Sequence, residues 1–184
     1  MDYKSKYLKY KKKYLELKKL SNMNGGGNKS FTYKFSDNVN NQCKECTRKY
    51  ISNPNGWISK GYTIVETNNE PDILVNFEGR ETMDKLFGNN LSLKGLSVTD
   101  RGTKPINIYF HLDNWNNPPD TFIKKYNRLD DYRAYLVQHE FGHALGYDHP
   151  NRPKNGEMKP CKVMLQQTKY TEPYCTVNPW VKNE

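Results

Sequence analysis

Apolar and polar residues alternate in short stretches of the chain. The stretch SFTYKF, residues 30–35, shows a period of two, which is typical of a strand that buries one face. Runs rich in β-branched and aromatic residues, bounded by glycine, proline or polar turns, indicate four more strands. These lie at residues 61–67, 72–78, 95–100 and 105–115.

The pattern changes to a helical one in two places. Residues 37–53 and residues 130–145 are predicted as helices, and Gly146 follows the second as a helix-ending residue. Residues 79–94 are polar and read as irregular, and the proline-containing tail is expected to be mostly irregular. Strands followed by one dominant helix favour an α+β fold with helices packed on one mixed, twisted sheet.

The first twenty residues differ from the rest of the chain. They hold eight of the lysines against Asp2 and Glu16, so they carry +6 of the net charge of +9. A stripe with helical spacing runs through them, made of Tyr3, Tyr7, Tyr10, Tyr14 and Leu17. A short helix of this kind is marginal alone in water, so the simplest interpretation is a solvated, partly helical leader. An anchor for an anionic surface, a nucleic-acid contact and a coiled-coil handle are the alternatives.

Composition divides the chain into three parts. A basic Tyr/Lys leader, residues 1–20, is followed by a linker of Asn, Ser and three consecutive glycines, residues 21–30. One domain, residues 31–184, then remains, and it is expected to be monomeric. No apolar run suits a membrane span or a secretory signal. The aromatic residues of the domain lack basic interleaving, so we predict no specific nucleic-acid binding there.

The stretch HEFGHALGYDH, residues 139–149, carries the strongest chemical signal. His139 and His143 are four residues apart, which places both imidazoles on one helix face, where they can hold a single zinc ion. In a continuous helix, His149 would lie about 240° around from His143 and could not reach that ion. Gly146 tolerates the left-handed backbone that ends a helix, so His149 can turn back as a third ligand.

Three protein ligands leave a fourth zinc position for water, which is the catalytic pattern. Glu140 follows the first ligand and would act as the general base for that water, then pass the proton to the leaving nitrogen. The sequence therefore predicts a zinc-dependent endopeptidase with one catalytic Zn²⁺ and a peptide or protein substrate. The alternatives are histidines without a metal, a structural zinc, and a non-catalytic zinc-containing binding module on the same fold.

The eleven-residue stretch resembles the extended zinc motif of the metzincin peptidases. That resemblance implies a methionine-bearing turn beneath the metal, for which Met164 in KVMLQQT is the candidate. It also implies that an edge strand, here residues 95–100, lines the cleft and that a peptide binds as an added strand. Some metzincins have a tyrosine two residues after this methionine. Gln166 stands there instead, which leaves Gln166 or Gln167 as candidate helpers.

Two further resemblances concern the origin of the chain. YRAYLVQHEFGHALGYDH, VMLQQT and CTVNPW are similar to segments of a secreted metzincin-like domain of actinobacteria. The leader, YLKYKKKYLELKKL followed by glycines, resembles N-termini of giant DNA virus proteins. If the protein is viral, the leader would contact a packaging partner, and a virion-associated or host-cytoplasmic location is expected.

Four cysteines allow three full pairings. A bridge between Cys161 and Cys175 would enclose the methionine turn and clamp the floor of the zinc site. Cys43 and Cys46, in the sequence CKEC, read as a short local bridge or as two free thiols. A redox centre or a second metal site is the less supported alternative.

Overall fold

The computed structural model describes residues 29–88, 95–118, 129–151, 159–170 and 175–184. The predicted leader and nearly all of the predicted linker lie outside these residues. Strand β1 (Ser30–Phe35) already includes the last residue assigned to the linker. Within the described part of the chain, no helix has the length and apolar character that crossing a membrane requires.

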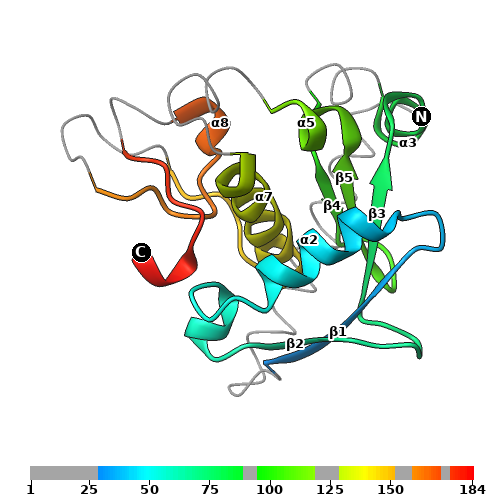
Figure 1. Cartoon of the computed structure of the whole chain (residues 1–184), viewed down its shortest axis with the longest axis horizontal. Helices are drawn as coiled ribbons and strands as arrows, with labels where there is room; N and C mark the ends of the chain where they lie inside the picture. Colours follow the sequence, from blue (N-terminus) through cyan, green and yellow to red (C-terminus); the bar gives the residue numbers. More distant parts are fainter. Residues whose placement is uncertain (1–28, 89–94, 119–128, 152–158, 171–174) are drawn as a thin grey trace.

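A five-stranded mixed sheet forms the centre of the fold (Figure 1). Its strands are β1, β2 (Thr63–Glu66), β3 (Ile73–Glu78), β4 (Val98–Asp100) and β5 (Ile106–His111). The order across the sheet is β2-β1-β3-β5-β4, with β4 at one edge. Four strands run parallel, and β4 pairs antiparallel with β5. This arrangement confirms the predicted α+β class, the mixed sheet and the edge position of the strand after residue 95.

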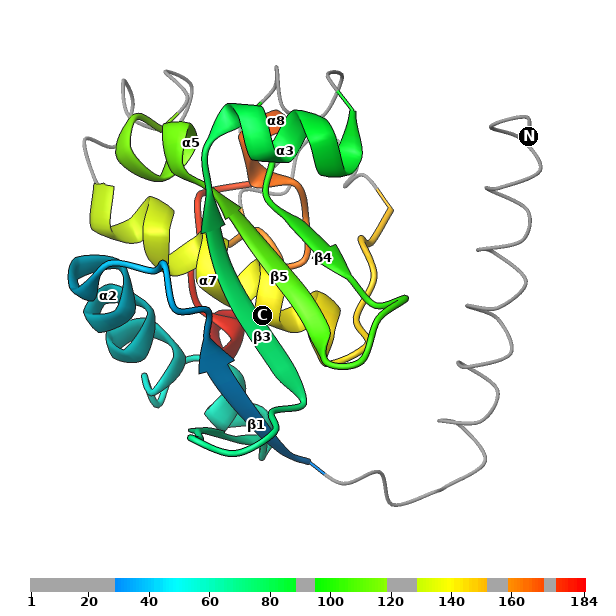
Figure 2. The same ribbon diagram turned by 90° about the vertical axis from the view of Figure 1, so that its right-hand side faces the viewer.

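The helices pack mainly on one face of the sheet. They are α2 (Asn41–Ile51), α3 (Arg80–Phe87), α5 (Leu112–Asn116), α7 (Leu129–Ala144) and α8 (Gln167–Tyr170), with short 3-10 turns η1 (Trp57–Lys60) and η2 (Val181–Asn183). Figure 2 shows β1, β3, β5 and β4 side by side with α7 behind them. Asn40 caps the start of helix α2, and its side-chain oxygen accepts a hydrogen bond from the Cys43 N–H at 2.9 Å. Helix α2 lies in the connection between β1 and β2, which pair in parallel, and parallel neighbours require such a crossover connection.

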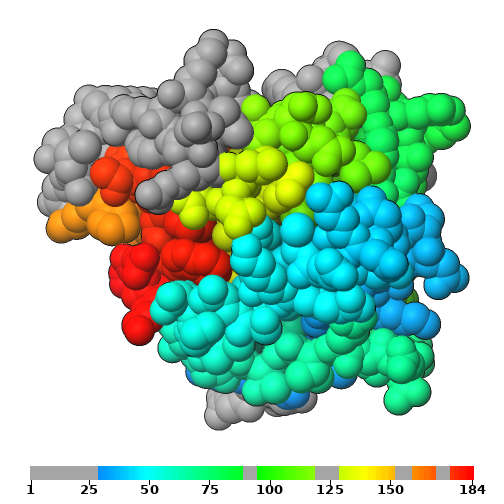
Figure 3. Space-filling model, in the orientation of Figure 1, coloured from blue at the N-terminus to red at the C-terminus, as the bar shows by residue number. Residues whose placement is uncertain are grey.

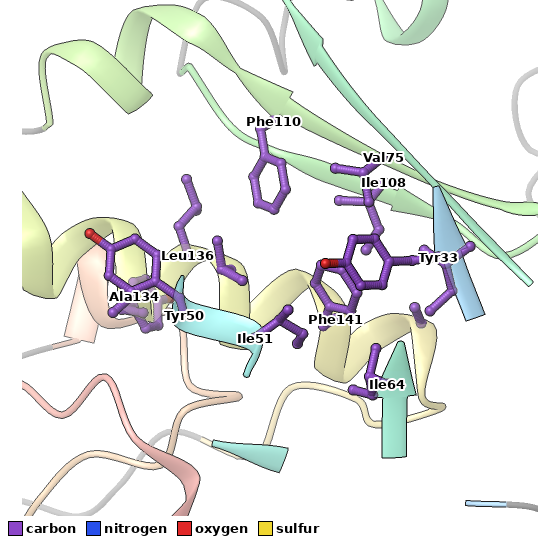
Figure 4. Packing of buried hydrophobic residues seen from close by; sticks show 14 of the residues in the cluster. Tyr33, Tyr50, Ile51, Ile64, Val75, Ile108, Phe110, Ala134, Leu136 and Phe141 are labelled. Carbon is purple, nitrogen blue, oxygen red and sulfur yellow. The ribbon is translucent and has the colours of Figure 1, made fainter. Parts of the chain in front are cut away.

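Helix α7 is buried on nearly all sides, which is why its apolar residues form no single stripe. Its Phe141 packs edge-on against Tyr33 of β1, with ring centroids 5.7 Å apart. Figure 4 shows Leu136 and Phe141 of α7 directed toward Ile108 and Phe110 of β5 and their neighbours. The helix predicted to carry the metal ligands is therefore also a central part of the hydrophobic core.

Two expectations about local structure were wrong. Residues 79–94 were expected to be irregular, but residues 80–87 form α3, which buries Met83 and carries an i,i+4 ion pair between Glu81 and Lys85. The strand predicted over 105–115 ends at His111, and α5 follows it at once. The His111 side chain accepts a hydrogen bond from the Asp113 N–H and so caps that helix.

The C-terminal segment packs against the chain that follows α2. Figure 3 shows the C-terminal residues, in red, next to the segment after α2 on the surface of the molecule. The Lys182 N–H donates a hydrogen bond of 2.9 Å to the Asn55 carbonyl. Further in, the Gln167 side chain accepts from the Asn178 N–H and donates to the Asn178 carbonyl. Side-chain hydrogen bonds therefore fix a segment that has little regular structure.

Candidate metal centre

Helix α7 and the turn after it bring three histidines together. His139 and His143 lie one helical turn apart, and the helix ends at Ala144. Gly146 has a φ of 96°, and the Tyr147 N–H donates to the Gly142 carbonyl at 2.9 Å, which reverses the chain direction. This change of direction places the imidazole of His149 next to those of His139 and His143.

The three Nε2 atoms face one another at nearly equal distances. They lie 3.0 Å apart for His139 and His149, 3.1 Å for His143 and His149, and 3.2 Å for His139 and His143. Tetrahedral ligands at a zinc–nitrogen distance of about 2.0 Å would be about 3.3 Å apart. The triangle is therefore close to the size that a single tetrahedral ion requires, and these histidines could hold a metal ion.

Backbone carbonyls determine which nitrogen of two of these rings carries the proton. Nδ1 of His139 lies 2.8 Å from the Val163 carbonyl, and Nδ1 of His143 lies 2.9 Å from the Tyr147 carbonyl. A carbonyl can only accept, so each Nδ1 donates and each Nε2 keeps its lone pair. Two lone pairs facing at 3.2 Å repel each other, and a cation between them removes this repulsion.

Burial keeps these rings neutral. It lowers the pKa of His139 to about 3 and that of His143 to about 4, because a charged imidazole would lose its hydration. The neighbouring histidines lower both values further, while the carbonyl hydrogen bonds oppose the shift. Neutral imidazoles are the form that binds metal, so two of the three candidate ligands are in that form at neutral pH.

Glu140 lies beside this cluster and is almost fully buried. Burial raises the pKa of its carboxyl to about 7, and a hydrogen bond from Thr99 opposes the rise. The Thr99 Oγ1 donates to Oε2 of Glu140 at 2.7 Å and also lies 3.0 Å from the Glu140 carbonyl. Since Thr99 belongs to β4, the edge strand holds this carboxylate directly.

A turn at residues 163–166 supports the cluster from below. Met164 in this turn is buried, and a side chain added at Gly142 would collide with its sulfur, so the turn lies directly against α7. The Tyr135 hydroxyl donates to the Leu165 carbonyl at 3.0 Å and accepts from the Gln167 N–H at 3.1 Å. The helix that carries two histidines therefore also fixes the turn beneath them.

A disulfide between Cys161 and Cys175 encloses that turn. The two residues are 14 apart in sequence, and their sulfurs pack with Leu165 in a small buried cluster. Cys43 and Cys46 are free thiols on α2. Of the pairings that the sequence left open, the structure contains the one next to the candidate metal centre.

The cluster opens into a cleft with a volume of about 760 Å³. One wall is the edge-strand segment from Gly95 to Thr99, continued by Arg101, and the other is formed by α7 and the residues after it. Gln166 lines the cleft, whereas Gln167 is fully buried in its hydrogen bonds with Asn178. Of the two glutamines considered as helpers, Gln166 alone borders this space.

Two polar contacts of the site could not be predicted from the sequence. Thr99 reaches Glu140 across 41 residues, and Arg101 forms an ion pair with Asp148 at 2.8 Å across 47 residues. Both depend on the pairing of β4 at the sheet edge, next to the end of α7. The prediction of an edge strand at the cleft was the closest sequence signal for these contacts. Successive side chains of a strand point to opposite faces, so some of them had to face the cleft.

The fold and site together define an α+β domain with a candidate three-histidine metal centre. The family model of DUF3152, described as a protein of unknown function, matches residues 7–179. The chain belongs to that family. No curated protein matches the chain.

The solved structures that are similar to part of this chain include one described as that of myroilysin. The similarity has a TM-score of 0.42 with 16% sequence identity, and it covers 79% of this chain and 61% of the myroilysin chain. The chain thus spans less than two thirds of that protein. The fold and the candidate metal centre described above are features of this chain's own structure.

Proposed function

We propose that residues 31–184 form a zinc-dependent endopeptidase of the metzincin type. The observation that carries this proposal is the convergence of three Nε2 atoms within 3.2 Å of one another, with Glu140 beside them in an open cleft. Three nitrogen ligands suit zinc and leave a coordination position open. An ion held there would polarise a peptide carbonyl and make a nearby water more acidic.

Glu140 is the residue we assign to proton transfer. Its Oε2 is occupied by the Thr99 hydroxyl, so Oε1 is the oxygen available to accept a proton from the attacking water. The same oxygen would then deliver this proton to the nitrogen that leaves as the peptide bond breaks. The resemblance of the HEFGHALGYDH stretch to metzincins, with Met164 in the supporting turn, favours this chemistry over a purely structural ion.

The edge strand would position the substrate. One side of β4 pairs with β5, and β4 is the last strand of the sheet within the described residues. A peptide in extended form could add to its other side through backbone hydrogen bonds. This would place a scissile bond next to Glu140, because Thr99 of β4 already contacts that side chain.

The test is cleavage of a reduced, alkylated protein by the full chain loaded with zinc. The Glu140→Gln variant should retain zinc and lose at least about 100-fold in rate, because the general base is absent. Glu81→Gln, which removes a carboxylate from the exposed face of α3, is the matched control and should cleave normally. Removal of zinc with a chelator should abolish cleavage, and added zinc should restore it.

Two results would contradict the proposal. Cleavage by Glu140→Gln at the wild-type rate would show that this carboxylate is not the base. A zinc-loaded wild-type chain that cleaves neither unfolded proteins nor a peptide library would instead support the alternative, a non-catalytic zinc-containing binding module.

A further inference from the structure

The third histidine lies in a different environment from the other two. His139 and His143 belong to a helix packed in the core, whereas residues 146–149 form an exposed turn. Ordering a metal ligand on an exposed turn costs conformational entropy. Unless contacts with neighbouring residues order the turn beforehand, this cost reduces the affinity for the metal. The contacts of Tyr147 and Asp148, the two residues directly before His149, restrict the backbone of this turn.

Tyr147 provides the first of these contacts. Its N–H donates to the carbonyl of Gly142, and its carbonyl accepts from Nδ1 of His143. Its ring packs on Trp57 with centroids 4.5 Å apart, and its hydroxyl lies 3.3 Å from that of Tyr62. These contacts fix the start of the turn, two residues before His149.

Asp148 provides the second contact, and it reaches across the cleft. Its Oδ1 lies 2.8 Å from an Nη of Arg101, the residue that follows β4. The chain around Arg101 is itself held, because Asp100 accepts a hydrogen bond of 2.8 Å from the Gly102 N–H. The Arg101 side chain is 26% exposed and that of Asp148 is 42% exposed, so water screens this pair only in part.

We propose that Arg101 is a positioning residue for the metal centre, acting through Asp148 on His149. The ion pair joins the end of the edge strand to the turn of the third ligand and holds that ligand in place before metal arrives. The inference rests on the metal-binding part of the proposed function and does not depend on peptide hydrolysis. Outer contacts of metal ligands typically change affinity 10- to 100-fold. Because this pair is partly exposed, we expect about a tenfold effect.

The test must separate positioning from charge. Arg101 lowers the pKa of His143 and Asp148 raises it, so both charges reach the ligand cluster. Removing one charge alone would alter the attraction for a cation. The double variant Arg101→Met/Asp148→Asn removes both and leaves the net charge unchanged. Its matched control is Arg48→Met/Glu66→Gln, which removes the pair between α2 and β2.

The measurement is the affinity and release rate of zinc(II), by competition with a chromogenic chelator, in the full-length chain. The double variant should bind zinc about tenfold more weakly and release it faster. The control pair should leave both values unchanged. Thermal unfolding of the metal-free proteins should show that the double variant is folded and no less stable than the control. Weaker zinc binding could then not be the result of a general structural defect.

The single variants add a second prediction. Asp148→Asn leaves a positive charge beside the ion and should weaken zinc binding more than Arg101→Met, which leaves a negative one. Zinc affinity of the double variant within twofold of wild type would overturn the inference. A wild-type chain that binds no zinc would overturn the metal centre as well. Zinc binding without peptide cleavage would contradict only the proposed peptidase.

Discussion

Gly142 lies between two of the candidate ligands and has no room for a side chain. A Cβ at this position would lie 2.5 Å from Cζ2 of Trp57 and would overlap the sulfur of Met164. The indole cannot move aside easily, because its Nε1 donates a hydrogen bond of 2.8 Å to the Gln138 carbonyl. Gly142→Ala should therefore displace α7 from the turn beneath it.

The size of this effect can be estimated from two opposing terms. Overpacking a close-packed core costs about 1–3 kcal/mol, and the two simultaneous contacts place this site near the upper end. Alanine has an intrinsic helix preference of about 1 kcal/mol over glycine, which offsets part of the cost. We expect a net loss of about 2 kcal/mol in the free energy of unfolding, together with weaker zinc binding, because His143 is the next residue.

Denaturant unfolding of the metal-free chain measures this loss. The Gly142→Ala change should cost less in a Met164→Ala background, because the truncated side chain leaves space for the new methyl group. A double-mutant cycle gives the coupling between the two sites. Equal or higher stability of Gly142→Ala in the wild-type background would refute the close contact between helix and turn.

Three further predictions concern other parts of the molecule. Thr99→Val should lower the rate of peptide cleavage about 10- to 100-fold with zinc affinity unchanged, since a hydrogen bond to a carboxylate contributes about 1.5–3 kcal/mol. Thr99→Ser should restore most of that rate, and a valine variant at the wild-type rate would remove the positioning role. Thiol titration of the denatured, unreduced chain should find two free thiols, and replacing Cys161 and Cys175 by serine should cost about 3 kcal/mol of stability; four free thiols would contradict the disulfide. Hydrogen bonds from Arg48 hold the pKa of Glu66 below its usual value of 4.5, so the pair stabilises the fold above pH 4.5 and this contribution is lost as the pH falls further. Arg48→Met should lower the free energy of unfolding by at most about 1 kcal/mol at neutral pH. A stability difference between wild type and variant that is the same at pH 7 and at pH 3 would disprove the linkage.

The sequence predicted the features that depend on local spacing. The i,i+4 placement of His139 and His143, and the glycine that ends the helix, can be read from residues within one turn of each other. The strands and the α+β class followed from alternation and from the order of elements. The helix over residues 80–87 was missed because Met83 is its only buried side chain, so its apolar pattern is weak.

The contacts that complete the site could not be predicted in this way. Thr99 and Arg101 reach Glu140 and Asp148 only because β4 pairs antiparallel with β5 at the sheet edge, and no local pattern specifies that pairing. The buried role of Gln167 depends on Asn178 in a segment with little regular structure. Its neighbour Gln166, which borders the cleft, has the same side chain, so composition could not distinguish the two.

The burial of α7 restricts where this domain can vary. A helix that carries two candidate ligands on one face and core residues such as Phe141 on the others tolerates few substitutions, because most changes would disturb either the packing or the histidine cluster. The cleft wall opposite is built from an edge strand and its flanking chain, and the three residues of β4 are only partly buried. Apart from Thr99 and Arg101, which contact Glu140 and Asp148, divergence within the family should therefore be concentrated on that wall. Relatives that keep the three histidines could then differ in the ligands that they select.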